Sequence, residues 1–136
     1  MCRIGDIVLI YNPIKNGRNI GTHSFVVLDD NAGSIQSVSF DFVGLIMSSM
    51  DTEEKKEKLM KYDGNLPITS NEQNITNGGN GKDACVKADQ FFYFNKNNIR
   101  YRVIGSLEPD IFNLLLDFIQ ELNNNGIRFE QVIDNT

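Results

Sequence analysis

The chain has 136 residues and a formal net charge of −5, with 40% hydrophobic and 23% charged residues. This length supports one domain over residues 1–136 and is too short for two. No stretch approaches the roughly 18 apolar residues of a membrane-spanning helix, so we expect no membrane partner. The chain turns polar at Arg3 without the apolar core of a signal peptide, which predicts a cytoplasmic location.

The cysteine and histidine content argues against a metal site. Cys2 and Cys85 are far apart in the sequence and neither belongs to a CxxC motif. With a single histidine, His23, the chain cannot supply a zinc site of the usual Cys2His2 kind. We therefore expect two free thiols, no metal and no other cofactor.

The first half of the chain reads as strands separated by turn formers. The pattern predicts strands at residues 4–11, 25–28, 34–40 and 41–47, with a hairpin turn at Asp29–Gly33. Gly44 inside the last of these strands predicts a bulge or a close backbone approach. The loop of residues 12–24 carries glycines, basic side chains and His23. Because a sheet fixes both ends of such a loop, it is the first candidate for the functional site.

The second half adds two helices. Acids precede lysines over residues 52–61, which favours a short exposed helix capped by Asp51 or Thr52. Apolar residues recur at three- and four-residue steps over 108–122, which predicts an amphipathic helix that Ser106 can cap. The fold class expected is mainly β with helices (α+β). Residues 65–80 are predicted to be a long surface loop, residues 84–88, 89–94 and 99–104 to be strands, and residues 127–136 to form a short edge strand or to fray.

Several short motifs occur in the order found in one family. They are Gly5–Leu9, Pro13–Lys15 through Gly21 to Phe25–Leu28, Val86–Gln90, and Val103–Leu107 ahead of the last helix. Over residues 4–122 the chain resembles the MazF/PemK toxins of bacterial toxin–antitoxin systems. The resemblance implies an SH3-like, plasmid-toxin-type barrel with a short exposed helix and a C-terminal amphipathic helix. It also implies a homodimer, a cognate antitoxin protein, and metal-independent endoribonuclease activity on single-stranded RNA.

The chain departs from the family where the chemistry is expected. The family's loop usually carries an acidic residue, a glycine and then Arg-Pro before the second strand. Here His23 stands at the position of that arginine, Ser24 at that of the proline and Arg18 at that of the acidic residue. A serine or threonine at the end of the family's third strand is matched by Ser48 or by Ser49.

These residue types suit cleavage by the RNA's own 2′-hydroxyl. Histidine exchanges protons near neutral pH, so His23 can take or give the proton. Arg18 offers a planar fork of donors to the phosphate, and Ser48 or Ser49 can donate a hydrogen bond to a phosphate oxygen. The remaining candidates for RNA contact lie in or next to the same loop: Lys15, Asn16, Asn19 and Thr22.

Structural roles remain open for the same residues. His23 can be a satisfied strand residue, Arg18 and Lys15 can be solvated, and the two serines can cap the following helix. The aromatic run Phe91–Phe94 can stack on bases or fill the core. Two other functions compete with this one. The first is an inactive MazF-like module that binds RNA or a protein. The second is a cysteine hydrolase of the cell-wall peptidase type, because residues 21–27 resemble the strand that carries the histidine in that family.

Overall fold

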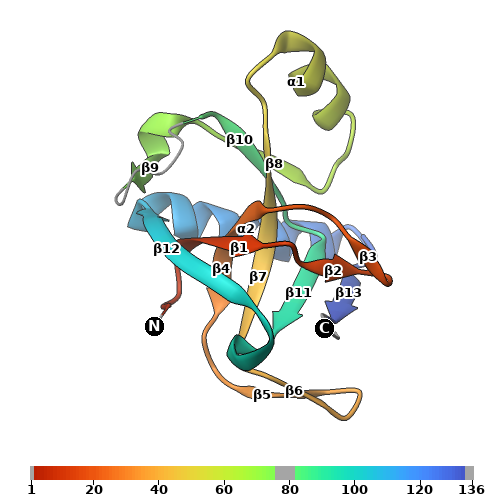
Figure 1. The fold of residues 1–136 in the computed structure, drawn as a ribbon. Coiled ribbons are helices and arrows are strands. Elements are labelled where there is room, and N and C mark those ends of the chain that lie inside the picture. The colour runs from red at the N-terminus through yellow and green to blue at the C-terminus, as the bar shows by residue number, and fades with distance from the viewer. Residues whose placement is uncertain (1, 76–81, 134–136) are drawn as a thin grey trace.

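The computed structural model describes residues 2–75 and 82–133 (Figure 1). The described part is mainly β with two α-helices, which confirms the predicted class. The helices are α1 (Glu53–Leu59) and α2 (Pro109–Asn124), and short 3-10 turns span Ser70–Glu72 and Lys96–Asn98. The strands are β1 (Asp6–Tyr11), β2 (Ile14–Lys15), β3 (Arg18–Asn19), β4 (His23–Asp29), β5 (Gly33–Ile35), β6 (Val38–Phe40), β7 (Phe42–Ser49), β8 (Asn65–Ile68), β9 (Gln73–Ile75), β10 (Ala84–Lys87), β11 (Gln90–Phe94), β12 (Arg100–Leu107) and β13 (Glu130–Ile133).

One large sheet carries the fold, in the order β13-β11-β7-β4-β1-β12-β9. β10 pairs with β7 and β8, and β13 runs parallel to β11 while the other pairs are antiparallel. Among the described strands nothing joins β9 to β13, so the sheet is open and is not the closed barrel that the resemblance implies. β13 confirms the predicted edge strand within residues 127–133, and residues 134–136 lie outside the description.

The sheet buries apolar side chains on both faces because its central strands alternate between two clusters. Ile7, Val26 and Leu45 lie on the face that also receives Leu115 and Leu122 of α2. The opposite face carries a second buried cluster: Cys2, Val8, Ile10, Phe25, Val27, Phe42, Ile46, Phe92, Phe94 and Val132. Burying one leucine or phenylalanine contributes roughly 1.5–3 kcal/mol, so these faces hold the strand register that positions the site.

Gly44 allows a close approach between strands, as its place within β7 predicts. A Cβ at this position would lie 3.4 Å from Phe25 Cβ and from Phe94 Cε2. The register of β4 against β7 also shifts between Val27 and Asp29, opposite this part of β7. Glycine therefore leaves room for two aromatic side chains of the core.

The prediction of a long loop over residues 65–80 is wrong for the first part of this stretch. Residues 65–68 form β8 against β10, and residues 73–75 form β9 against β12. Asn65 is buried, and its Nδ2 donates to Leu59 O at 2.8 Å. Pro67 is tolerated because β8 is paired on one side only among the described strands. Residues 76–81, the Asn/Gly-rich part of this stretch, lie outside the described residues.

Two hairpin turns also differ from expectation. Residues 29–33 do not make the predicted turn, because β4 pairs with β7 and the turn lies instead at Gln36–Ser37, between β5 and β6. The loop of residues 12–24 contains a further hairpin, β2–β3, whose central residues are Asn16 and Gly17. Both turns have positive φ at both central residues: 51° at Gln36 and 66° at Ser37 in one turn, and 52° at Asn16 and 76° at Gly17 in the other. Asn-Gly is the preferred pair for such a turn.

The helix caps are partly as predicted. Thr52 caps α1, and its Oγ1 accepts a hydrogen bond from Lys55 N at 3.2 Å. The predicted cap of α2 by Ser106 is wrong, because that residue belongs to β12 and Glu108 occupies the cap position without a side-chain bond. Pro109 then opens the helix, where its missing N–H costs nothing. Neither described helix is long and apolar enough to cross a membrane.

Candidate functional site

The site begins where two neighbouring strands of the sheet separate. β4 and β7 pair from Asp29–Val43 to Phe25–Ile46 and no further. Beyond this point the first residues of β4 stay paired with β1, while the last residues of β7 stay paired with β10. Figure 1 shows β7 continuing past β4 toward β10 and α1. The separation leaves a gap in the sheet that side chains from both strands border.

A cavity of about 400 Å³ occupies this place. The start of β4 and the end of β7 both contribute to its lining, together with apolar residues of β1 and β12. Four of the residues predicted from the sequence meet here, although up to 27 positions separate them. The lining residues are Ile7, Leu9, Thr22, His23, Ser24, Met47, Ser48, Ser49, Lys55, Lys82, Ala84 and Ile104.

Strand alternation divides the polar residues between the two faces of the sheet. Ser24 is paired with Leu9, and Ser49 is two residues beyond Met47, so both belong to the face packed against α2. His23 is paired with Ile10 and belongs to the other face, as does Ser48. Residues of both faces line the cavity because the strands have separated at this point.

His23 is half-buried and hydrogen-bonded to the loop before β4. Its Nε2 lies 2.9 Å from Ile20 O. A carbonyl oxygen only accepts, so Nε2 carries the hydrogen and the lone pair of the neutral ring is on Nδ1. The contact fixes the ring and defines which nitrogen can accept a proton. Ser48 and Ser49 are strand residues, and the cap of α1 is Thr52, so neither serine has the capping role that the sequence left open.

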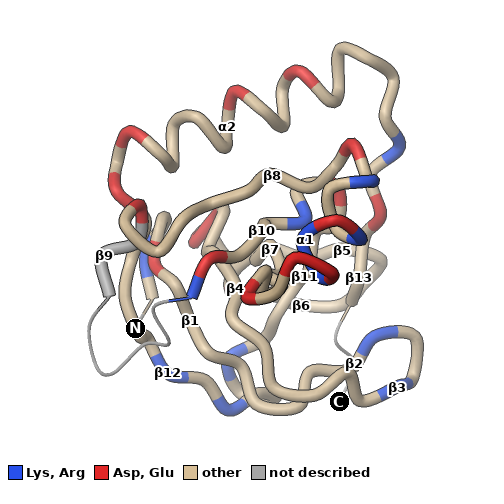
Figure 2. The backbone as a smooth tube through the Cα atoms, turned by 90° about the horizontal axis from the view of Figure 1, so that it is seen from above, with Lys and Arg blue, Asp and Glu red and all other residues tan. Residues whose placement is uncertain are grey.

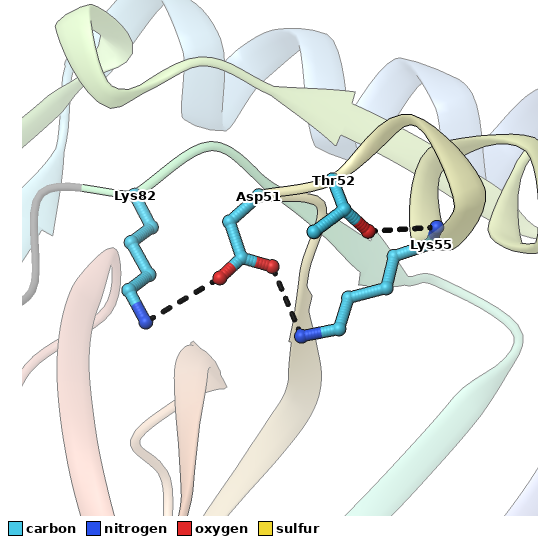
Figure 3. Close-up of polar contacts among 4 residues, drawn as sticks. All are labelled: Asp51, Thr52, Lys55 and Lys82. Carbon is cyan, nitrogen blue, oxygen red and sulfur yellow. Dashed lines mark hydrogen bonds and ion pairs between the residues drawn. The ribbon is translucent and has the colours of Figure 1, made fainter.

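Two lysines that the sequence did not single out supply the positive charge. Asp51 lies between them, 3.0 Å from Lys55 Nζ and 3.6 Å from Lys82 Nζ (Figure 3). The hydrogen bond from Lys55 lowers the pKa of Asp51, so this carboxylate stays charged. The two ammonium groups exceed the one carboxylate, which leaves the group positive. The i, i+4 spacing of Asp51 and Lys55 was the available sequence signal.

The β2–β3 hairpin carries the other predicted residues away from this cavity. Lys15, Asn16, Arg18 and Asn19 are not among its lining residues. Asn19 Oδ1 accepts from Gly21 N at 2.8 Å, and Asn16 occupies a turn position, so both have local structural roles. Arg18 is exposed on β3. The hairpin forms because an Asn-Gly turn joins two short paired segments, and this folds the loop back on itself.

The lysine of this hairpin instead contacts β11 and β13. Lys15 Nζ donates to Gln90 Oε1 at 3.1 Å and forms an ion pair with Glu130 at 3.3 Å. The Lys15 side chain is therefore fixed by two partners and is not fully solvated.

Neither thiol is placed for nucleophilic chemistry at the cavity. Cys2 and Cys85 are free, as expected; both are buried, and neither lines the cavity. Burial raises the pKa of both thiols, which disfavours the reactive thiolate. This argues against the cysteine-hydrolase alternative. Among the described residues, no three His, Cys, Asp or Glu side chains are grouped so as to hold a metal ion.

The aromatic run of β11 packs inside the protein. Phe92 and Phe94 are fully buried. The ring of Phe91 stacks on Phe129 at 5.2 Å between centroids, and that of Tyr93 meets Phe40 edge-on at 5.0 Å. Phe92 and Phe94 therefore belong to the core, and the other two rings pack against aromatic neighbours.

Comparison with known proteins assigns no family. No protein-family model matches this chain, and no curated protein matches it. The MazF/PemK resemblance thus rests on the residues quoted above.

Proposed function

We propose that this chain is the toxin component of a toxin–antitoxin system, a metal-independent endoribonuclease that cleaves single-stranded RNA by attack of the 2′-hydroxyl. One observation carries the proposal. His23 and the serine pair at the end of β7 line a single cavity together with Lys55 and Lys82. A proton carrier, hydroxyl donors and cations are the three kinds of group that this reaction uses.

His23 is the proton carrier in this reaction. Nδ1 accepts the proton of the 2′-hydroxyl as the new bond between the 2′-oxygen and phosphorus forms. The bond between phosphorus and the 5′-oxygen then breaks, the departing oxygen takes a proton from water, and the protonated His23 gives its proton to the hydroxide that remains. The products are a 2′,3′-cyclic phosphate and a 5′-hydroxyl end. The bond from Nε2 to Ile20 O orients the ring for this step.

Lys55 and Lys82 take the part that the sequence assigned to Arg18. Their ammonium groups stabilise the charge that develops on the phosphate oxygens, and the Ser49 hydroxyl adds a hydrogen bond. Asp51 holds both lysines beside the cavity. A bound phosphate competes with this carboxylate for the same donors.

The partners in this proposal rest on the family resemblance alone. They are a cognate antitoxin protein that inhibits the enzyme and a second copy of the chain in a homodimer. The substrate is mRNA, which places the action of the toxin in the cytoplasm.

The test compares the purified protein with the His23→Ala variant on a long, defined, single-stranded RNA in the presence of a chelator. We expect cuts with 5′-hydroxyl ends at a recurring short sequence, and a loss of roughly 100-fold or more in the variant. Equal cleavage by both forms would retain the ribonuclease and remove His23 from its mechanism. Mapping the new ends identifies the sequence that is cut.

A second candidate is a catalytically inactive module that binds RNA or a protein. It is favoured by the placement of His23 on the face of the buried Ile10 and by its bond to Ile20 O, both of which suit a structural role. RNA binding without cleavage by the folded wild-type protein would establish this module.

A further inference from the structure

A second cavity lies next to the first, and the two share one lining side chain. It has a volume of about 500 Å³ and lies between α1 and the strands β8, β10 and β11. Lys55 lines both cavities. The lining residues are Lys55, Lys58, Leu59, Tyr62, Asn65, Lys87, Asp89 and Gln90. The two cavities are therefore neighbours, with the Lys55 side chain in the wall of each.

The second cavity combines positive charge with an exposed aromatic ring. Three lysines (Lys55, Lys58 and Lys87) and one carboxylate, that of Asp89, line the cavity, so cations are in excess. Tyr62 has 62% of its surface exposed, which is the largest exposed fraction among the large hydrophobic residues described. Sites that bind single-stranded nucleic acid combine two elements: positive side chains that bind the phosphate backbone, and aromatic rings on which the bases stack.

The cavity is held in shape by its neighbours. Asn65 Nδ2 donates to Leu59 O and ties β8 to the end of α1. Asp89 packs directly over Gly64, where any Cβ would overlap its carboxylate. Gln90 Oε1 accepts from Lys15 Nζ, so the β2–β3 hairpin is anchored at one of the lining residues. Lys15, one of the RNA-binding residues predicted from the sequence, thus contacts a residue that lines the second cavity.

We infer that the second cavity is a subsite for a nucleotide of the same single-stranded RNA, flanking the nucleotide that is cleaved in the first cavity. Tyr62 stacks on the base, and Lys58 and Lys87 bind the flanking phosphates. Lys55, shared by both cavities, binds the phosphate between them. The inference rests on the proposed function for the identity of the ligand. A volume of about 500 Å³ is within the range of small-ligand sites and accommodates one nucleotide.

The test measures binding and cleavage separately. Binding is followed by fluorescence anisotropy of a labelled 12-nucleotide RNA with 2′-O-methyl groups, which lacks the attacking hydroxyl and cannot be cut. We expect Tyr62→Ala to weaken binding by roughly five- to hundredfold, and Tyr62→Phe, which keeps the ring, to bind like the wild type.

The lysines are tested by the salt dependence of binding. Lys58→Ala and Lys87→Ala should each lower the slope of log affinity against log salt by about 0.7, the value for one phosphate contact of a single strand. Lys56→Ala is the matched control, because Lys56 belongs to the same helix but lines neither cavity. Its slope should equal that of the wild type.

The outcomes separate the subsite from the proposed function. Binding of the 12-nucleotide RNA to Tyr62→Ala at wild-type strength would overturn the subsite, whatever the cleavage assay shows. Loss of binding in Tyr62→Ala and retention in Tyr62→Phe would support it even if the wild-type protein cuts no unmodified RNA. A wild-type protein that cuts RNA but shows no effect of Tyr62, Lys58 or Lys87 would keep the ribonuclease and remove the subsite.

Discussion

Replacement of Ser49 by alanine tests which serine of β7 serves the reaction. Ser49 is opposite Ala84 on β10, and that alanine lines the first cavity. Ser48 also borders the cavity, but it is opposite Cys85, which is fully buried and does not line it. Side chains of a strand alternate between the faces, so the two hydroxyls point to opposite sides. We expect Ser49→Ala to slow RNA cleavage and Ser48→Ala to leave it near the wild-type rate.

The size of the effect follows from the exposure of the site. A hydrogen bond to a charged group contributes about 1.5–3 kcal/mol, and roughly 1.4 kcal/mol is a factor of ten. Ser49 is half-buried beside an open cavity, where water competes for the phosphate, so the lower part of this range applies. The expected loss in kcat/KM is therefore about ten- to thirtyfold. Folding should change by no more than about 0.5 kcal/mol, because no large side chain is removed.

The assay is kcat/KM for a short single-stranded RNA in chelator, with thermal unfolding of each variant as the control for folding. Equal losses in Ser48→Ala and Ser49→Ala would show that strand alternation does not decide which hydroxyl acts. A larger loss in Ser48→Ala would show that the serine on the same face as His23 is the one that acts. Either result would refute the argument from alternation.

Three further predictions concern charge, capping and the thiols. Asp51→Asn releases Lys55 and Lys82 from their shared carboxylate, so RNA binding should tighten and its salt slope should steepen when affinity is measured over a salt series. Thr52→Ala removes the cap of α1, at a cost of about 1 kcal/mol, and should weaken RNA binding through displacement of the helix, whereas Thr52→Ser should not. Burial raises the pKa of both thiols above the ordinary value of 9.0. Their contribution to folding stability is therefore fully present at pH below 9.0 and is lost as the pH rises through their pKa values in the folded protein. Denaturant titrations should show that loss, and a thiol reagent at neutral pH should react only after unfolding.

The elements that the sequence predicted well are those whose signals are local. The acids and lysines around Thr52 mark α1 within the stretch 52–61, and the apolar spacing marks α2. The strands that failed depend on partners far along the chain. β8 contains Pro67, and β9 lies among polar residues, so their strand structure comes from pairing with β10 and β12. The local composition of a segment does not indicate whether a distant segment will pair with it.

The same distinction explains the site. The family pattern led to His23 and to the serine pair of β7, and the structure brings these residues to one cavity. Arg18 was chosen because it stands at the family's acidic position and its guanidinium suits a phosphate, but the Asn-Gly turn at residues 16–17 folds it onto an exposed hairpin. Lys55 belongs to the stretch predicted to be a short exposed helix, and the sequence offered no role for Lys82. Only the tertiary fold, in which Asp51 holds both, places them at the cavity.

The negative net charge of the chain sets an expectation for how it holds RNA. Figure 2 shows acidic residues spaced along α2, away from the basic β2–β3 hairpin. Charges more than about 8 Å apart are largely screened at physiological ionic strength, so the lysines at the two cavities act locally. At low salt the acidic body repels RNA, and added salt weakens this repulsion while it also weakens the phosphate contacts. The measured salt slope should therefore be shallower than the number of contacting lysines implies, and a slope as steep as that number would show that the acids play no part in binding.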